Sequence, residues 1–170
     1  MNQNHVFSNT FPSEISRVKQ IVIEILEFLR AFFPFISKEE ESDIKLIFSE
    51  LLYNAAIHGN KENADKNVKV IISVMKNHVH GYIKCEIADE GIGFNHKKLI
   101  NSLKTTDSHA LPESDHGRGV LIAASLTDNF AYNGKGNVIS FSKHINCTPL
   151  LESHTDLVKT KLSGRISSNG

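Results

Sequence analysis

Glu50, Asn54 and His58 stand four residues apart in a segment that reads SELLYNAAIHGN from position 49 to position 60. In an α-helix, residues at this spacing lie one above another on nearly one face. A carboxylate one turn from a carboxamide suits phosphate chemistry, because the carboxylate can accept a hydroxyl proton and the amide oxygen can bind Mg²⁺. Glu and Asn on an exposed helix edge are also commonly just solvated. The spacing alone therefore leaves a phosphate site and an ordinary polar surface both open.

The helix that carries this polar stripe should have an apolar side as well. Between the three polar positions lie small or apolar residues that can pack inward, namely Leu51, Leu52, Ala55 and Ala56. Gly59 follows, and glycine is the residue that helices favour just past their end. We expect the stripe to border a cleft at the end of a helix.

Two glycine-containing segments lie further along the chain. Residues 89–94 read DEGIGF directly after a predicted strand, where glycine allows positive φ and close backbone approach. Residues 117–119 read GRG before an apolar helix, where free N–H groups and the helix dipole suit phosphates. An ordinary turn and a solvated arginine are the other interpretations. Neither GxxxxGK[ST] nor GxGxxG occurs, so a nucleotide would have to be bound in another way.

The rest of the pattern predicts a two-layer α/β (α+β) sandwich, with helices on one face of a mixed, mostly antiparallel sheet. Pro12 and Ser13 should open a first helix that Pro34 ends, and Ser37 with Glu40 makes a capping box for the second. The other expected elements are a strand at 6–11, an antiparallel pair at 68–74 and 82–88, a short helix at 95–104, a polar loop at 105–116, and a hairpin at 129–143 that turns at 133–136.

Length and composition favour one domain over residues 1–147 and a poorly ordered polar tail over 148–170. Lys plus Arg and Asp plus Glu both number 19, so no net charge favours nucleic acid or an anionic membrane. The chain shows neither a signal-peptide pattern nor a membrane-span pattern, and we expect a cytoplasmic protein. Two cysteines form no disulfide framework, and nine histidines show no zinc spacing.

Three blocks, at residues 50–60, 89–94 and 116–137, together resemble the N, G1 and G2 boxes of the histidine-kinase-like ATPase superfamily, also called Bergerat-type. Their order and spacing are far more specific than any one of them. The short form, with NAxxHGN and with GRG before an apolar helix, is most similar to the anti-sigma-factor serine/threonine kinases. The resemblance covers roughly residues 6–145 and implies the histidine-kinase-like ATPase fold.

The resemblance implies a role for each matching residue. Glu50 becomes the general base, Asn54 the Mg²⁺ ligand, and Asp89 the carboxylate that recognises adenine, whose exocyclic amine is a donor. Gly91 and Gly93 would let the backbone lie close to the base. The remaining nucleotide-binding candidates are His58, Gly117, Arg118, Gly119 and Asn137, and Lys61 could also approach the phosphates.

Two departures from the family pattern stand out. No HE or HD dipeptide on a helical hairpin is present, which argues against autophosphorylation on histidine. Asn137 stands where much of the wider superfamily has a threonine that helps to hold adenine. The second departure bears on nucleotide affinity and not on the fold.

The function that the resemblance implies is an ATP- and Mg²⁺-dependent serine/threonine protein kinase in a partner switch. It would phosphorylate an anti-sigma-factor antagonist of the STAS type and sequester a sigma factor, with a homodimer as a further possibility. The loop at 105–116 would close as a lid. The alternative is a nucleotide-binding module that sequesters a partner without phosphorylating it.

Overall fold

Helices and strands form two layers in this computed structural model, which describes residues 3–76, 80–95 and 115–146. The helices of the described residues are α1 (Ile15–Phe32), α2 (Lys38–Tyr53), the π-helix η1 (Asn54–Gly59) and α4 (Asp115–Ser125). The strands are β1 (Gln3–Pro12), β2 (Asn67–Lys76), β3 (His80–Asp89), β4 (Asn129–Tyr132) and β5 (Val138–Asn146).

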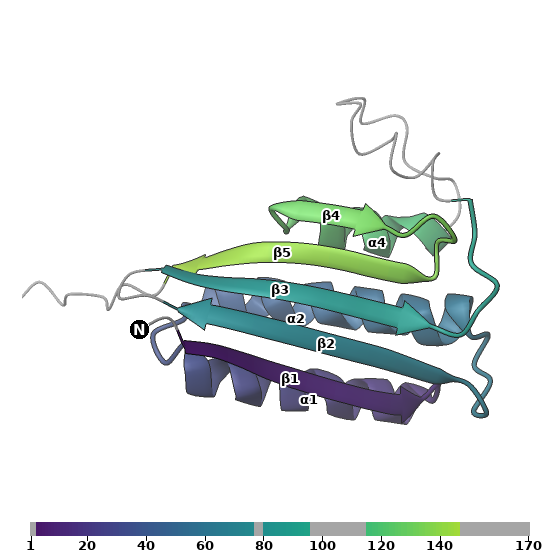
Figure 1. The fold of residues 1–170 in the computed structure, drawn as a ribbon, viewed down its shortest axis with the longest axis horizontal. Coiled ribbons are helices and arrows are strands. Elements are labelled where there is room, and N and C mark those ends of the chain that lie inside the picture. The colour runs from purple at the N-terminus through teal and green to yellow at the C-terminus, as the bar shows by residue number, and fades with distance from the viewer. Residues whose placement is uncertain (1–2, 77–79, 96–114, 147–170) are drawn as a thin grey trace, which may run out of the picture.

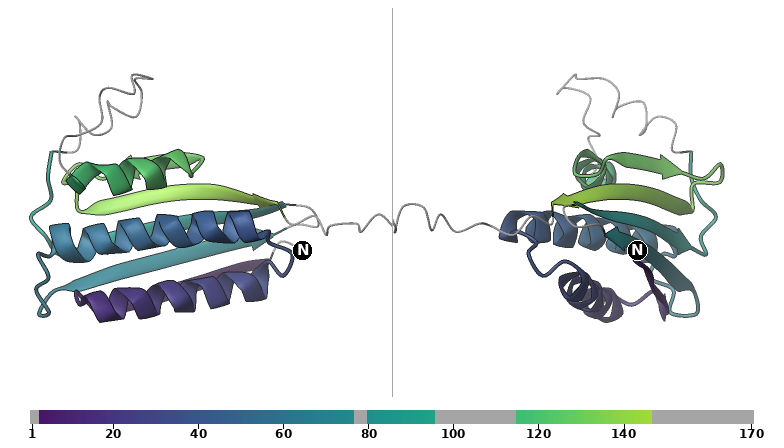
Figure 2. Two further views of the ribbon diagram at one scale, coloured as in Figure 1. Left: turned by 180° about the vertical axis from the view of Figure 1, so that it is seen from behind. Right: turned by 60° about the vertical axis from the view of Figure 1, so that its left-hand side comes forward.

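The sheet has the strand order β1-β2-β3-β5-β4, and the helices cover one of its faces (Figures 1 and 2). This confirms the predicted two-layer sandwich. The predicted sheet was mixed, whereas every pairing among the described strands is antiparallel. Short hairpin connections join β2 to β3 and β4 to β5, and such connections can only give antiparallel neighbours.

The first helix forms as predicted but begins later than Pro12 and Ser13. Its buried side chains recur at helical spacing, as Val18, Ile21, Val22, Ile25, Leu26 and Leu29. The residue before the helix is Glu14, whose side chain makes no capping hydrogen bond. The Ser13 hydroxyl instead donates to the Lys66 carbonyl at 3.0 Å, because Ser13 is buried in the corner where β1 meets β2.

The second helix has half of the predicted capping box. Ser37 accepts a hydrogen bond from the Glu40 N–H at 3.1 Å, which satisfies one of the free donors of the first turn. The Glu40 carboxylate does not return to Ser37, since it accepts from the Asn146 N–H at 3.1 Å. The start of α2 is therefore tied to the end of β5.

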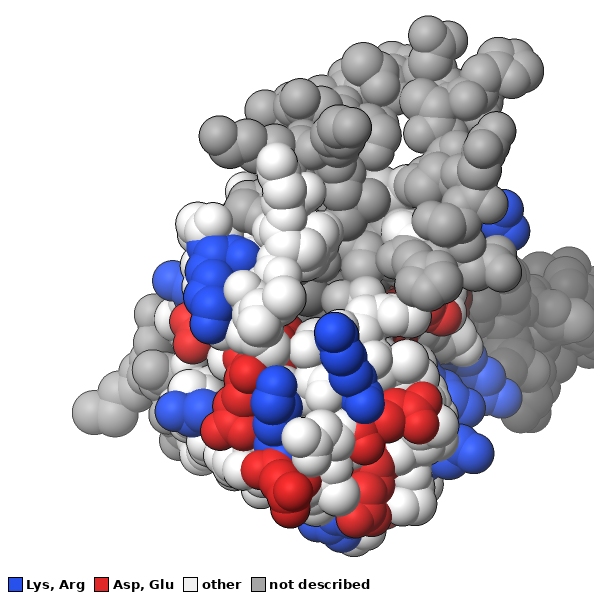
Figure 3. Space-filling view, turned by 90° about the vertical axis from the view of Figure 1, so that its right-hand side faces the viewer, with Lys and Arg blue, Asp and Glu red and all other residues white. Residues whose placement is uncertain are grey.

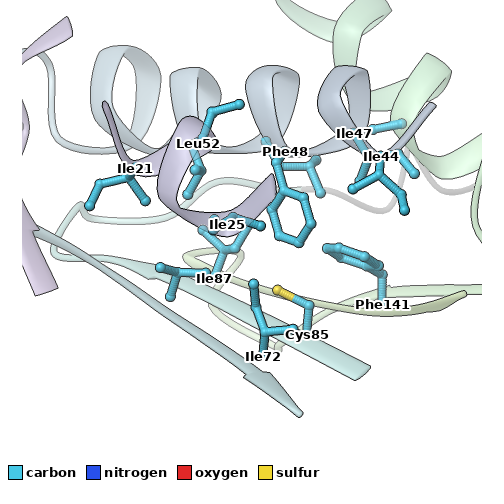
Figure 4. Close-up of a cluster of buried hydrophobic side chains, with 14 of the residues drawn as sticks. Ile21, Ile25, Ile44, Ile47, Phe48, Leu52, Ile72, Cys85, Ile87 and Phe141 are labelled. Atoms are coloured by element: carbon cyan, nitrogen blue, oxygen red, sulfur yellow. The ribbon is translucent and has the colours of Figure 1, made fainter. Parts of the chain in front are cut away.

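The core lies between the helices and the inner face of the sheet (Figure 4). Phe48 of α2 meets Phe141 of β5 edge to face, with ring centroids 5.6 Å apart. Cys85 is buried among these side chains, as predicted, and burial raises the pKa of its thiol well above the usual value. The neutral thiol therefore behaves as a small apolar side chain.

A buried asparagine, Asn60, connects the ends of several strands at one corner of the sheet. The Asn60 side-chain amide donates to the Ser13 hydroxyl at 2.7 Å and to the Asn67 carbonyl at 2.8 Å. Its oxygen accepts from the Glu90 N–H at 2.8 Å. We call Asn60 and these three partners the Asn60 clasp, because it links the ends of β1, η1 and β3 to the start of β2.

Several predicted segments lie outside the described residues. They are the short helix over most of 95–104, the part of the polar loop up to residue 114, and the tail at 148–170 with its domain boundary. Residues 115 and 116 belong to α4 and not to a loop. Within the described part of the chain, the helices lack the length and apolar character that crossing a lipid bilayer requires.

Replacing Asn60 with alanine should lower the free energy of unfolding by about 2 kcal/mol, because the buried Ser13 hydroxyl and two part-buried backbone groups each lose a hydrogen bond. Asn63→Ala is the matched control, since Asn63 is exposed and its side chain accepts the local Asp65 N–H. Its effect should stay within about 0.5 kcal/mol. Urea unfolding measures both, and equal effects of the two substitutions would contradict the clasp.

Candidate functional site

The polar stripe spans a change in helix type. The α-helix α2 ends at Tyr53, and residues 54–59 continue it as the π-helix η1, in which the Asn60 N–H donates to the Ala55 carbonyl. The sequence predicted an uninterrupted α-helix through His58, so this is a correction. A π-turn is wider than an α-turn and recurs at functional sites. Asn54 stands at the junction, and Ala55 and Ala56 are buried as predicted.

A cavity of about 350 Å³ opens at the end of η1, beside the end of β3. Its volume lies in the range of small-molecule sites. At this end of the molecule, acidic and basic side chains are interspersed (Figure 3). The lining residues come from all three candidate blocks and from their flanks, as Asn54, His58, Gly59, Lys61, Asp89, Ile92, Gly93, Phe94 and Gly136.

Asp89, the last residue of β3, presents its carboxylate to this cavity. The side chain is half-buried, and one oxygen accepts the Gly91 N–H at 2.8 Å. Burial raises the pKa of the Asp89 carboxyl above its usual value, although the Gly91 bond and the charges of Lys135 and Lys66 oppose this shift. A partly desolvated acceptor of this kind discriminates strongly in favour of a donor ligand.

Glycines let the backbone pack tightly around Asp89. A Cβ on Gly59 would lie 2.6 Å or less from both carboxylate oxygens, and a Cβ on Gly91 would meet the Gly59 carbonyl. Gly59 does not have the positive φ expected of a helix terminator; that conformation falls on Lys61 and Glu62, with φ of 57° and 54°. Gly59 is required for its small volume instead.

The turn between β4 and β5 closes the cavity from the other side. Gly93 has φ of 78°, and the Phe94 N–H donates to the Lys135 carbonyl at 3.1 Å. The Asn133 side chain accepts from the Gly136 and Asn137 N–H groups, which holds the turn in shape. Gly136 then forms part of the cavity lining.

Asn137 lies beside the site and not in its lining. Its amide donates to the Asp89 carbonyl at 2.9 Å, and its oxygen accepts from the Asn133 amide at 3.0 Å. These bonds position the end of β3 and thus the Asp89 side chain. Contact between Asn137 and a nucleotide stays a prediction.

Glu50 lies against the first turns of α4. A Cβ on Gly119 would collide with the Glu50 carboxylate, so only glycine at position 119 leaves room for the Glu50 side chain. The sequence placed residues 117–119 before the helix, whereas the structure includes them in it. Gly117 is buried and Arg118 is exposed. Glu50 is not among the residues that line the cavity.

Sequence reasoning missed several residues that shape the site. Ile92 and Phe94 form an apolar wall, and Phe94 meets Tyr132 edge to face at 5.2 Å. Burial, together with the nearby Asp89 charge, raises the pKa of Tyr132 far above its usual value. The alternation of apolar Ile92 and Phe94 with Gly91 and Gly93 in DEGIGF could have predicted this apolar wall.

A metal ion at this site would need a substrate to supply some of its ligands. Among the described residues, no group of three or more His, Cys, Asp and Glu side chains could hold one. Mg²⁺ bound through phosphates needs only one or two protein oxygens, and the Asn54 side chain, which lines the cavity, offers one.

Comparison with known proteins gives one family and three relatives. The profile of the histidine kinase-like ATPase domain matches residues 11–143. An anti-sigma F factor of Bacillus velezensis is 28% identical over 127 residues, which cover 73% of this chain and 82% of that protein. Those of Priestia megaterium and Bacillus subtilis are 26% identical, over 72% and 73% of this chain and 81% and 82% of those proteins.

Gly93→Ala should lower the free energy of unfolding by at least about 2 kcal/mol, because the residue has positive φ and its Cβ would collide with the Lys135 carbonyl. Gly134→Ala in the neighbouring turn is the control, since a Cβ there meets nothing within 4 Å. Thermal melting distinguishes the two. A Gly93→Ala protein as stable as Gly134→Ala would contradict the described packing.

Asp89→Asn should stabilise the protein without ligand at neutral pH. The pKa of the Asp89 carboxyl is raised in the folded state, so its ionised form opposes folding above that pKa, and this cost disappears as the pH falls through it. Asparagine keeps an oxygen that can accept the Gly91 N–H. Urea unfolding across acidic and neutral pH should show a gain that shrinks toward low pH; a loss at neutral pH would contradict it.

Proposed function

The chain belongs to the histidine kinase-like ATPase family, and on that premise we propose that it is an ATP-dependent serine/threonine protein kinase of the anti-sigma-factor type. The observation that carries the proposal is the placement of three polar groups, Asp89, Asn54 and Glu50, from the end of β3, the start of η1 and the last turn of α2. Asp89 and Asn54 both line the glycine-walled cavity, and Glu50 stands one helical turn before Asn54, against α4. An adenine, a phosphate chain and a hydroxyl substrate would meet these groups in the same order.

The recognition of adenine would rest on Asp89. Its carboxylate only accepts hydrogen bonds, and the exocyclic amine of adenine only donates them. The apolar side chains of Ile92 and Phe94 would cover the face of the base, and Gly93 would let the backbone approach it. His58 and Lys61 line the same cavity on the η1 side and could contact the rest of the nucleotide.

The phosphates would lie between Asn54 and the first turn of α4. Free N–H groups and the positive end of the helix dipole favour anions there, and Arg118 in the same turn adds a positive charge. The Asn54 amide oxygen would hold Mg²⁺, which neutralises charge on the phosphates when it is bound. Glu50 would accept the proton of the partner's serine or threonine hydroxyl as that oxygen attacks the terminal phosphate.

The protein partners are proposed from the relatives. Those proteins are named as anti-sigma F factors. By the same assignment, this chain would sequester a sigma factor in the cytoplasm and phosphorylate a STAS-type antagonist, either alone or as a homodimer. The balanced charge of the chain agrees with protein partners better than with nucleic acid.

A second candidate function is a nucleotide-binding module that sequesters its partner without phosphorylating it. The position of Glu50 favours this alternative, because its carboxylate lies against Gly119 and outside the cavity lining. In that case Glu50 would only help α4 to pack on α2.

Two substitutions separate the two functions. Glu50→Gln keeps the size and removes the base, so ATP binding should survive while phosphotransfer falls by about 10² to 10⁴-fold. Asn54→Ala should weaken Mg²⁺-dependent ATP binding as well as turnover, because it removes a metal ligand. Calorimetry measures the binding, and labelled ATP with a STAS-type antagonist measures the transfer.

The results would be read against the wild type. A wild-type protein that binds ATP and never labels the antagonist would support the sequestering module. A Glu50→Gln variant that transfers phosphate at the wild-type rate would remove Glu50 from the mechanism. A wild-type protein that does not bind ATP would contradict both candidates.

A further inference from the structure

A second hollow lies on the outer surface of the helical layer and shares no lining residue with the cavity at Asp89. It is a groove of about 480 Å³ between α1 and α2, which run side by side (Figure 2). Val22 and Leu26 form its floor, and Ile23 stands on its wall with 56% of its surface exposed. An isoleucine this exposed on the rim of a concave apolar surface marks a site of contact.

The groove has the dimensions of a bound helix. Its α2 side runs from Glu41 to Tyr53, which at about 1.5 Å per residue is about 18 Å of helix. Glu41, Lys45, Ser49 and Tyr53 follow one another at a spacing of four, so they form one continuous wall. A groove between two parallel walls with an apolar floor is the surface on which amphipathic helices bind.

The charges on the rim select the partner. Arg30 is engaged with Glu41, because its Nε donates to one carboxylate oxygen at 3.1 Å and its Nη2 donates to the other. Lys19 and Lys45 line the groove on opposite helices, and neither has an ion pair or hydrogen bond to any described residue. Lys45 also acts electrostatically on Glu41, but Glu41 is the one acidic residue that lines the groove, so the lining carries an excess of positive charge.

We propose that the α1/α2 groove is a docking site for an amphipathic helix of a partner protein whose apolar face is flanked by carboxylates. The apolar face would cover Ile23 and the floor, and the carboxylates would pair with Lys19 and Lys45. The proposal goes beyond kinase activity and does not depend on it, since the groove and Glu50 lie on different flanks of α2.

Two synthetic peptides test this proposal with the full chain and no nucleotide. Each is a labelled helix of about 14 residues, the length of the groove, with leucine at positions i, i+3, i+4 and i+7. One carries glutamate along both edges and the other carries lysine. Fluorescence anisotropy at low salt should show the acidic peptide binding at least about tenfold more tightly, and added salt should reduce this difference because the rim is exposed.

Variants locate the binding. Lys19→Glu with Lys45→Glu should reverse the preference between the two peptides, and Ile23→Asn should weaken both by roughly tenfold. The controls lie on the uncovered face of the sheet, where Val6 is 57% exposed and Lys84 is also exposed. Val6→Asn and Lys84→Glu should leave both affinities unchanged. Circular dichroism checks that each variant is folded.

The proposal fails in any of three cases. The wild type binds neither peptide, or it binds both equally. The double lysine variant keeps the wild-type preference while remaining folded. The control substitutions change binding as much as the groove substitutions do. None of these results depends on whether the chain transfers phosphate.

Discussion

The buried side chain of Asn60 is the constraint on which the candidate site depends. One amide bonds a hydroxyl, a carbonyl and an N–H from three separate segments, and Asn60 itself lies between Gly59 and Lys61, which both line the cavity. A buried amide that makes several hydrogen bonds rigidifies its surroundings, whereas an apolar side chain of the same size would remove one hydrogen bond from each of the three polar groups. The corner of the sheet is thus fixed by hydrogen bonds as well as by the packing of core residues such as Phe11 and Val68. Asp89 stands next to Glu90 in this corner, so the position of its carboxylate follows from the clasp.

Glycine acts at this site mainly through its missing side chain. Gly59 and Gly91 leave room for the Asp89 carboxylate and for each other, and Gly119 leaves room for Glu50. Of these three and Gly93, only Gly93 uses the left-handed backbone that other residues avoid. The carboxylates of Asp89 and Glu50 therefore occupy space that the side chain of any other residue type at these glycine positions would fill. This explains why the glycines and the acids occur together in the three blocks.

The sequence predicted most of the fold because periodicity and turn chemistry are local. The strands, the two long helices and the hairpin at 133–136 follow from alternation, helical spacing and glycine content. The π-helix at 54–59 could not be predicted, because Asn60, whose N–H bonds the Ala55 carbonyl, is held by Ser13, Asn67 and Glu90, two of which are distant in the sequence. Two side-chain hydrogen bonds could not be predicted either. The Glu40 carboxylate accepts from the Asn146 N–H and not from the local Ser37 N–H, and the Asn137 amide donates to a backbone carbonyl 48 residues away. Of the candidate site residues, the cavity brings together Asn54, His58, Asp89 and Gly93, and it leaves Glu50 and Asn137 at its border.

The bond between Glu40 and the Asn146 N–H fixes where the chain leaves the sheet. Glu40 lies in the first turn of α2 and Asn54 follows its last, so these ends are about 21 Å apart at the rise of a helix. A fluorophore or an affinity handle fused after β5 would thus be anchored at the opposite end of α2 from the cavity. The C-terminal side is therefore the better attachment point for immobilising the protein on a sensor, whereas a label introduced at the β4–β5 turn would sit on the cavity itself.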